Sequence, residues 1–197
     1  MSILETERET YANLWGAVPA YGDHAPGEHY LLLFLSMIAR PTGTVLDAGT
    51  GTGKGAVALQ RQGFEVRLCD VTDAGLVPEA KALPFTQACL WHDLYPVTRA
   101  FGHPGRNMAD YVYCCDVLEH IPPQFTMLAI DQMLRVADRG LFLAVSLVPD
   151  SFGVWAGTSL HQTVQPFTWW RDSLRELGTV LEARDLVGNA VFMVARA

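Results

Sequence analysis

The chain has 197 residues, of which 50% are hydrophobic and 18% are charged, and its formal net charge at pH 7 is −7. This length and composition predict one compact domain, with a core large enough to need neither a disulfide nor a structural metal. The negative net charge argues against a protein that binds nucleic-acid backbones over a broad surface.

Membrane insertion and secretion are not indicated. The longest apolar runs, Tyr30–Ala39 and Leu141–Val148, are shorter than the ~20 residues that a spanning helix needs, and Met1–Thr10 lacks a signal-peptide pattern. The cysteines lie in apolar runs and form no C-x-x-C pair, which favours core thiols in a reducing compartment over a zinc or disulfide framework. They are Cys69, Cys89, Cys114 and Cys115. We therefore expect a soluble, cytoplasmic protein.

The first 40 residues precede the first predicted strand. A polar, amphipathic segment from Ser2 to Trp15 predicts a short helix, the glycine- and proline-containing segment Gly16–Gly27 predicts a loop, and a second helix is expected over Gly27–Ala39. We expect residues 1–40 to form a helical lid over the rest of the domain. Anchoring of the N-terminal segment to the surface explains its aromatic and polar residues equally well. These residues are Tyr11, Trp15, Tyr21 and His24.

The most informative stretch runs from Val45 to Leu59 and reads V-L-D-A-G-T-G-T-G-K-G-A-V-A-L. It predicts a strand, a glycine turn and a helix whose first N–H groups face a ligand. A phosphate-binding P-loop is excluded, because Ala48 stands at its first glycine position and Gly55 at its serine or threonine position. A dinucleotide site would hold a pyrophosphate here, which Asp47 would repel. A cationic ligand fits this acid better.

The segment L-D-A-G-T-G-T-G resembles motif I of the class I methyltransferases that use S-adenosylmethionine (SAM). SAM carries an ammonium and a sulfonium, and both are attracted by a carboxylate. The resemblance implies that Asp47 lies below the methionine end of the cofactor and that three glycines hold this end. These are Gly49, Gly51 and Gly53.

Residues 41–197 alternate between strand and helix patterns, which predicts a parallel sheet with crossover helices. The predicted strands are Thr44–Asp47, Glu65–Asp70, Ala88–Trp91, Asp110–Cys115 and Leu141–Val148, followed by a helix that ends at Leu177 and a hairpin of Val180–Asp185 and Ala190–Ala195. We therefore expect an α/β, Rossmann-like three-layer sandwich in one domain, 1–197. Its seven-stranded sheet is mostly parallel and ends in an antiparallel hairpin, which is the class I methyltransferase topology.

Ligands of such sheets bind beyond the carboxyl ends of the strands. Asp70 ends the second predicted strand about twenty residues after the glycines, a spacing typical of an acid that binds ribose hydroxyls. We expect Asp70 and the adjacent Val71 to contact the ribose, although a turn aspartate is the alternative. The segment Cys89–Leu94 resembles the methyltransferase element in which an acid, here Asp93, meets the adenine amino group and a bulky residue, Trp91 or Leu94, flanks the ring. Core packing is the alternative for Trp91.

The segment from Asp110 to Pro122 reads D-Y-V-Y-C-C-D-V-L-E-H-I-P and resembles a second methyltransferase element, D-x-x-x-x-x-[DE]-V-L-E-H-[IV]-P. In that resemblance Cys115 and Asp116 lie beside the methionine portion and the transferable methyl. Tyr21, in the N-terminal segment, is expected to cover the cofactor as part of the lid. Further similarities are to compact stand-alone methyltransferase-domain proteins common in bacteriophage genomes. They are P-G-E at Pro26, C-L-W at Cys89, and L-H-Q-T-V-Q-P-F-T-W-W over Leu160–Trp170; the chain has an extra His92 where those proteins read L-W-D-L.

Methyl transfer needs a positioned acceptor and, for an oxygen nucleophile, a group that removes its proton. Glu119, His120 and His161 are the candidate catalytic residues. If a helical turn follows the fourth strand, Asp116 shares a face with Glu119 and His120. One alternative is a metal-dependent O-methyltransferase, in which a divalent metal is bound by Asp116, Glu119, His120 and His161. The sequence Asp-x-x-Glu-His at residues 116–120 resembles the Glu-x-x-Glu-His of the O-methyltransferases of small-RNA 3′ ends and of ubiquinone biosynthesis. A metal-free acid or base is the other.

The acceptor is left open by the sequence. Adenine-N6 and cytosine-N4 DNA methylases carry an Asn or Asp followed by Pro-Pro-aromatic after the fourth strand, and cytosine-C5 enzymes need a Pro-Cys nucleophile; neither pattern occurs. We expect SAM-dependent methyl transfer to oxygen or nitrogen of a small molecule or modified nucleotide, with nucleic acid and membranes unlikely partners. A non-catalytic SAM-binding module and a nicotinamide oxidoreductase are the competing hypotheses.

Overall fold

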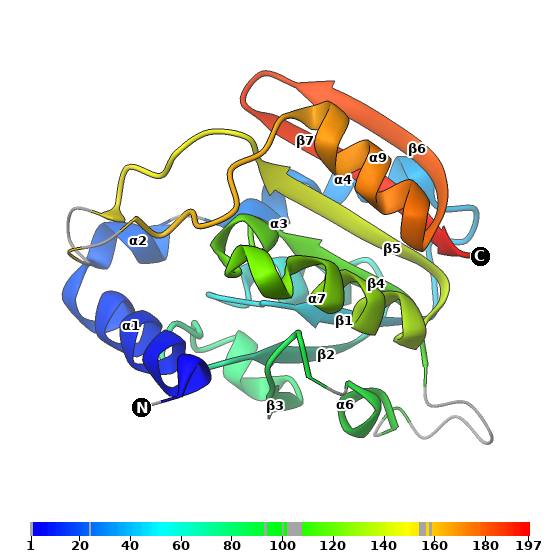
Figure 1. Cartoon of the computed structure of the whole chain (residues 1–197). Coiled ribbons are helices and arrows are strands. Elements are labelled where there is room, and N and C mark those ends of the chain that lie inside the picture. The colour runs from blue at the N-terminus through cyan, green and yellow to red at the C-terminus, as the bar shows by residue number, and fades with distance from the viewer. Residues whose placement is uncertain are drawn as a thin grey trace.

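The computed structural model describes residues 2–23, 25–92, 94–99, 101, 108–153, 157 and 159–197; for Pro19 it describes the backbone alone. Its centre is a seven-stranded sheet in the order β3-β2-β1-β4-β5-β7-β6 (Figure 1). The strands are β1 (Thr44–Ala48), β2 (Glu65–Asp70), β3 (Phe85–Gln87), β4 (Ala109–Cys115), β5 (Ala137–Ser146), β6 (Gly178–Leu186) and β7 (Asn189–Arg196). The strands β1 to β5 pair in parallel, and β6 and β7 form the antiparallel hairpin. The predicted fold class is confirmed.

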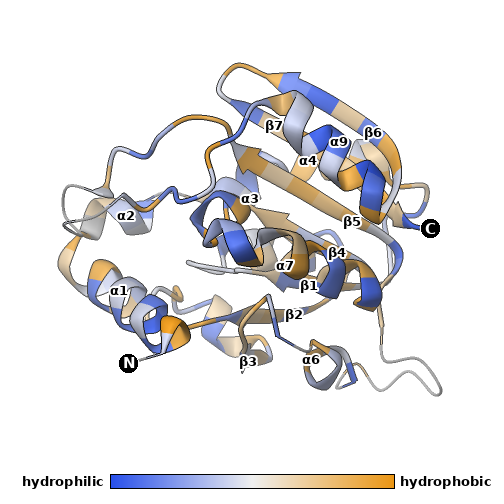
Figure 2. Cartoon of the chain, viewed as in Figure 1, coloured by the Kyte–Doolittle hydropathy of each residue, from blue (hydrophilic) through white to orange (hydrophobic). Residues whose placement is uncertain are grey.

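Helices cover both faces of this sheet (Figure 1). They are α1 (Ile3–Ala17), α2 (Pro19–Asp23), α3 (Pro26–His29), α4 (Leu31–Met37), α5 (Lys54–Arg61), α6 (Tyr95–Arg99), α7 (Pro123–Val136) and α9 (Phe167–Leu177), with 3-10 turns η1 (Ala80–Ala82) and η2 (Leu118–His120). Figure 2 shows hydrophobic residues along the central strands, while α1 and α9 carry both kinds. This pattern is typical of amphipathic helices that pack one side on a core.

The two faces of the sheet form separate hydrophobic cores. Alternation along β4 places Cys114 in one core and Cys115 in the other, as expected for neighbouring residues of a strand. Phe34 of α4 is fully buried and makes edge contacts with the rings of Tyr113 and Phe142, which stack on each other. The segment before β1 therefore contributes a central side chain to one of the cores.

Several predicted boundaries were wrong. The third strand is Phe85–Gln87, whereas Ala88–Trp91 forms a turn in which the N–H of His92 donates to the carbonyl of Cys89 at 3.0 Å. The apolar side chains of this run are buried by tertiary packing, which a hydropathy pattern cannot distinguish from burial in a strand. The second helix is divided at Tyr30 into α3 and α4, α2 lies in the predicted loop, and only η1 separates β2 from β3.

The strand β5 also begins and ends earlier than predicted, at Ala137 and Ser146.

At the start of the chain, Ser2 caps α1, since its side chain accepts from the N–H of Glu5 and the side chain of Glu5 accepts from the N–H of Ser2. Helix α1 lies at the edge of the sheet reached by the carboxyl ends of the parallel strands (Figure 1). Its inner residues Leu14 and Tyr11 pack with Leu160 in a small cluster separate from both main cores. A lid function for residues 1–40 stays a prediction.

Candidate active site

The turn between β1 and α5 contains three glycines in the left-handed region, and their surroundings differ. A Cβ on Gly49 would lie 2.5 Å from the side chain of Val117, and a Cβ on Gly53 would collide with Ala80. A Cβ on Gly51 would meet only the ring of Trp15, 3.4 Å away. Gly49 and Gly53 therefore allow close packing of the turn, while Gly51 exposes backbone below the indole of Trp15.

Asp47 is the buried acid below this turn. It is 5% exposed, and its Oδ2 accepts a hydrogen bond of 2.7 Å from the hydroxyl of Thr50. Burial raises the pKa of Asp47 to about 7, although the Thr50 hydroxyl and the N–H of Ala56 oppose this. A cation bound nearby would favour the ionised form. The site is therefore suited to the positively charged ligand expected from the sequence.

Asp70 joins the end of β2 to the glycine turn. Its Oδ2 accepts from the N–H of Gly51 at 2.9 Å, and its Oδ1 accepts from the N–H groups of Val71 and Thr72 at 2.7 and 3.4 Å. Burial raises its pKa in spite of these bonds. Asp70 thus has the turn role that was the alternative in the sequence, and it still lines a cavity beside Val71.

Two adjoining cavities lie at this edge of the sheet. The larger has a volume of about 460 Å³ and the smaller about 100 Å³, and they share wall residues from α1, the glycine turn and the end of β4. Predicted site residues on the larger cavity are Tyr21, Asp47, Gly49, Gly51, Cys115, Asp116, His120 and His161. Those on the smaller are Tyr21, Gly49, Gly51, Asp70, Val71, Trp91, Asp116 and His120. Gly53 and Glu119 line neither cavity, and Asp93 and His24 lie outside the described residues.

Trp91 packs in the core, which was the alternative for this residue, and it also lines a cavity. Its indole is 8% exposed and stacks on the ring of Phe125 with centroids 5.2 Å apart, so it belongs to the main core. One part of it still faces the smaller cavity, across from Asp70 and below α1.

Asp116 follows β4 in an unusual backbone conformation. Its φ is 52°, in the left-handed region that side-chain-bearing residues seldom adopt. Its N–H donates to the carbonyl of Ala144 at 2.9 Å, but its buried Oδ1 has no hydrogen-bond partner among the described residues. Burial raises its pKa to about 6. Strain and an unpartnered carboxylate oxygen at one residue are typical of functional sites.

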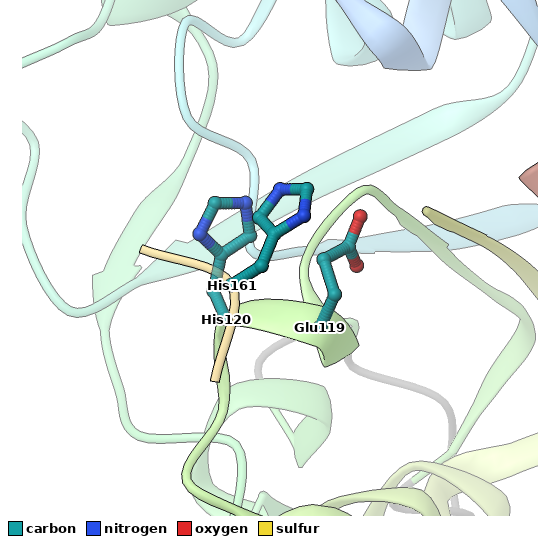
Figure 3. Close-up of side chains that lie close together, drawn as sticks. All are labelled: Glu119, His120 and His161. Carbon is teal, nitrogen blue, oxygen red and sulfur yellow. The ribbon is translucent and has the colours of Figure 1, made fainter. Parts of the chain in front are cut away.

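Glu119, His120 and His161 lie close together (Figure 3), with one ligand atom of each residue within 4.8 Å of the others. The buried Glu119 accepts from the N–H of Ser146 at 2.8 Å through Oε1, while its Oε2 has no partner among the described residues. Burial and then the charge of Asp116 raise its pKa well above the usual range. Since the turn is a 3-10 turn that begins after Asp116, the predicted group of four is reduced to these three.

The two histidines are each held through Nδ1. Nδ1 of His161 lies 2.6 Å from the carbonyl of Val148, which can only accept, so in the neutral ring Nδ1 carries the proton and Nε2 carries the lone pair. Nδ1 of His120 lies 2.9 Å from the hydroxyl of Tyr11. Burial and the nearby His161 lower the pKa of His120 to about 3, so this ring is neutral at physiological pH.

Asp150 organises the segment that carries His161, and the sequence analysis missed it. Its carboxylate accepts from the N–H groups of Leu160 and His161 at 2.8 and 3.2 Å, the hydroxyl of Ser159 at 3.1 Å and the N–H of Gly153. Burial opposes ionisation, but these bonds outweigh it and lower the pKa. Asp150 closely follows a predicted strand end, so the rule that located Asp70 also applied to it.

A family model described as a methyltransferase domain matches residues 28–188. The chain belongs to this family. It is a SAM-dependent methyltransferase, as the two sequence motifs predicted. No curated protein matches the chain in a sequence search.

Solved structures of methyltransferases share the fold. The 1,6-didemethyltoxoflavin-N1-methyltransferase of Burkholderia thailandensis has a TM-score of 0.70 at 16% identity, over 96% of this chain and 87% of that one. Magnesium protoporphyrin IX methyltransferase of Synechocystis has a TM-score of 0.63 at 19% identity, over 90% and 84%. An O-methyltransferase family protein of Burkholderia thailandensis has a TM-score of 0.61 at 15% identity; the match covers 91% of this chain and 59% of that one.

The residues present in this methyltransferase fit the cofactor. The larger cavity falls within the usual range of about 300–1,000 Å³ for small-molecule sites. It offers the buried carboxyl of Asp47 for a cationic group and the backbone around Gly51 for close approach. No described helix of the methyltransferase has both the length and the apolar character needed to cross a membrane.

Proposed function

We propose that the methyltransferase transfers the methyl group of SAM to an amine or hydroxyl of a small molecule that binds in the larger cavity. The observation that carries this proposal is that one cavity joins two groups of residues. Asp47 and the glycine turn line it, and so do Asp116, His120 and His161. A donor and an acceptor bound to these two groups would be held together, which is the main requirement of a displacement reaction.

Each predicted cofactor-binding residue has a proposed role, and Asp116 stands where the cofactor and the acceptor meet. Asp47, with the turn built by Gly49, Gly51 and Gly53, would hold the methionine end. Asp70 and Val71 would contact the ribose, and Trp91 with Asp93 the adenine. Tyr21 would cover the cofactor, and Cys115 and Asp116 would form the wall near the methyl. SAM, when bound, supplies a methyl on a positively charged sulfur.

On the acceptor side, His161 is the proposed base. The Val148 carbonyl fixes the proton on Nδ1, so the lone pair of Nε2 is the one available to accept a proton from the acceptor. His120 packs edge to face against His161, with ring centroids 4.7 Å apart, and is neutral, so it adds no charge that would oppose proton uptake. Glu119 lies beside these two histidines, and the N–H of Ser146 holds its carboxylate in place.

Calorimetric titration of S-adenosylhomocysteine tests the cofactor side. Asp47→Asn and Asp70→Asn are expected to weaken binding tenfold or more, about 1.4 kcal/mol, whereas the surface variant Asp172→Asn leaves it unchanged. Failure of the unmodified protein to bind would contradict the proposal. Transfer of labelled methyl to a small-molecule extract tests turnover. Tight cofactor binding without any transfer would favour the non-catalytic module instead.

A metal-dependent reaction is a second candidate, favoured by the group of Glu119, His120 and His161. One carboxylate and two imidazoles match a common set of ligands for a divalent transition metal, and the unpartnered Oε2 of Glu119 lacks only such a partner. Protein oxygens hold Nδ1 of both rings, as is usual for metal-binding histidines. A metal there would lower the pKa of a bound hydroxyl.

Calorimetry on chelator-treated protein tests this second candidate. Mn²⁺ and Zn²⁺ are titrated separately into the unmodified protein, Glu119→Gln and His161→Ala. A metal site requires binding that both variants weaken, together with methyl transfer that falls on chelation and returns with metal. Unchanged transfer in the presence of chelator would leave the metal-free reaction.

A further inference from the structure

Apart from the imidazoles of His29, His120 and His161, the side chains of the two cavities that can carry a charge at neutral pH are carboxylic acids. The carboxylic acids among them are Glu7, Asp47, Asp70, Asp116 and Asp150, and no lysine or arginine of the described residues lines either cavity. Lys54, which begins α5, points elsewhere: its Nζ donates to the carbonyl of Gly22 at 3.1 Å, and it lines a third, separate hollow. Any bound molecule therefore meets a negative field.

The proposed cofactor site accounts for only part of these acids. Asp47 faces the cationic end of SAM, and Asp70 is assigned to the ribose. Asp116 and Asp150 remain on the acceptor side, with Glu119 buried behind Asp116. The four donors to the carboxylate of Asp150 hold it in its charged form, and Asp116 has one oxygen without a partner among the described residues.

An anionic acceptor would be unfavourable here. A phosphate or carboxylate of the acceptor that leaves water needs a positive partner, and Asp116 and Asp150 supply carboxylates there instead. A cationic acceptor would find attraction from Asp116 and Asp150, and aromatic rings that can face a cation at Tyr21, Tyr30 and Phe152. The acceptor must also carry an N–H or O–H group for methylation.

We infer that the acceptor is an amine without phosphate or carboxylate groups, drawn in as its ammonium form. This inference rests on the proposed function and narrows its acceptor class. After the ammonium gives one proton to Nε2 of His161, the nitrogen lone pair forms the new N–C bond as the C–S bond breaks. The sulfonium charge passes to the methylated nitrogen, and the proton on His161 leaves to water. Nucleotides are excluded as acceptors by their phosphates.

The test uses the complex with S-adenosylhomocysteine and probes that share a phenylethyl skeleton. Ligand-observed NMR would measure the dissociation constants of 2-phenylethylamine, 2-phenylethanol, 3-phenylpropionate and 2-phenylethyl phosphate. The amine is expected to bind at least tenfold more tightly than either anion, with the alcohol between them. An anion that binds as tightly as the amine, or an amine that does not bind at millimolar concentration, would overturn the inference.

Variants connect this preference to the named acids. Asp116→Asn and Asp150→Asn are each expected to reduce the ratio between amine and anion affinities at least threefold, while Asp172→Asn on α9 keeps it. Asp116→Asn preserves the side-chain shape, so it serves if Asp150→Asn disturbs the segment that carries His161. An unchanged ratio in both acid variants would also overturn the inference. Binding of S-adenosylhomocysteine is measured first, because its absence would refute the proposed function and its presence isolates the acceptor class.

Discussion

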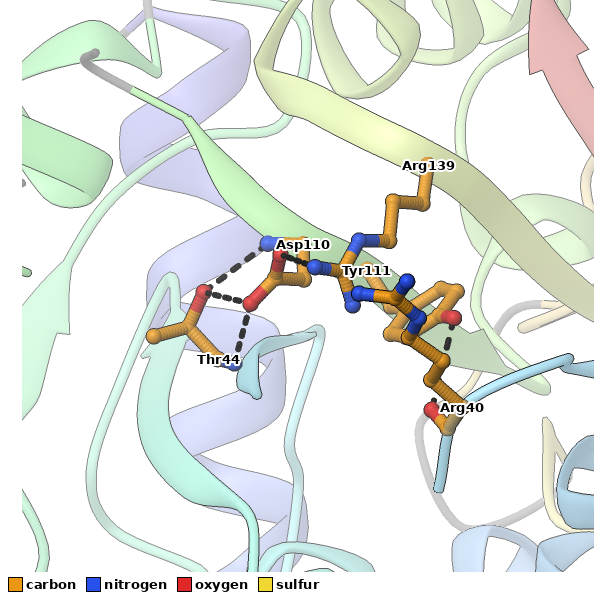
Figure 4. Close-up of polar contacts among 5 residues, drawn as sticks. All are labelled: Arg40, Thr44, Asp110, Tyr111 and Arg139. Atoms are coloured by element: carbon orange, nitrogen blue, oxygen red, sulfur yellow. Dashed lines mark hydrogen bonds and ion pairs between the residues drawn. The ribbon is translucent and has the colours of Figure 1, made fainter. Parts of the chain in front are cut away.

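Asp110 and Asp116 stand at opposite ends of β4 and have opposite surroundings. Both carboxylate oxygens of Asp110 are partnered (Figure 4): Oδ2 accepts from the N–H and hydroxyl of Thr44 at 2.8 and 3.1 Å, and Oδ1 lies 3.1 Å from the guanidinium of Arg139. The N–H of Asp110 donates back to the Thr44 hydroxyl at 2.8 Å. Asp116 has a buried oxygen with no partner among the described residues and a strained backbone.

The difference shows how one strand serves both stability and function. A carboxylate whose hydrogen bonds are complete joins β1, β4 and β5 at the amino end of the sheet. A carboxylate left incomplete at the carboxyl end raises the energy of the free protein and is relieved when a ligand binds. The same residue type therefore predicts opposite outcomes of substitution at the two ends.

Asp110→Ala is expected to have the largest effect on stability. It leaves the buried N–H of Thr44 and the guanidinium of Arg139 without their carboxylate, which should lower the free energy of unfolding by about 3 kcal/mol. Denaturant unfolding measures this. Asp131→Ala is the control, because it breaks only the exposed helical pair with Arg135 and should cost about 0.5 kcal/mol. Equal losses in the two variants would remove the contrast between partnered and exposed aspartates.

Asp116→Asn is expected to stabilise the free protein at neutral pH by about 1–2 kcal/mol. The folded-state pKa of about 6 lies above the usual value of 3.8, so stability is full below pH 4 and is lost as pH rises through 6. Asparagine does not titrate, so the difference in stability between the variant and the unmodified protein should grow between pH 4 and 6 and then stay constant. Thermal unfolding across this range measures it. If the variant is less stable than the unmodified protein at pH 8, the carboxylate of Asp116 stabilises the folded protein, as that of Asp110 does.

The affinity for SAM should rise with pH, about tenfold between pH 6 and pH 8. Burial raises the pKa of Asp47 to about 7, and only its ionised form attracts the cofactor's positive groups. Calorimetry on the unmodified protein and on Asp47→Asn at several pH values measures this, and the variant should show a flatter profile. An equally steep profile in Asp47→Asn would assign the pH dependence to another group.

The sheet and its ligand-binding edge followed from sequence because both depend on local patterns. Apolar runs with alternating helices fixed the parallel strands, and the glycine turn with Asp47 identified the cofactor family. The position of β3 did not follow, because Cys89, Leu90 and Trp91 are buried by tertiary packing rather than strand pairing. A run of three apolar residues has too little periodicity to separate these cases.

The acceptor side was less predictable for a physical reason. Glu119 and His120 lie in a recognisable motif, but His161 joins them only through hydrogen bonds made across distant segments. The carbonyl of Glu119 accepts from the N–H groups of Gln162 and Thr163 at 2.7 and 2.8 Å, which aligns the segment of His161 beside η2. Asp150 follows a predicted strand end, but its role depends on the backbone N–H groups of Leu160 and His161, whose approach no sequence pattern reveals.

Tyr11→Phe is expected to give the smallest effect, about 1 kcal/mol of unfolding free energy. The change removes the hydroxyl 2.9 Å from Nδ1 of His120 and keeps the ring that packs with Leu14 and Leu160. Because this bond, this small cluster and the bond between Glu7 and Gln162 are among the contacts that hold α1 on the domain, hydrogen exchange should quicken in α1 and remain slow in β4. If hydrogen exchange quickens in α1 and β4 together, α1 unfolds with the cooperative core. The elements at the carboxyl ends of the strands would then be as stable as those at the amino ends, where Asp110 lies.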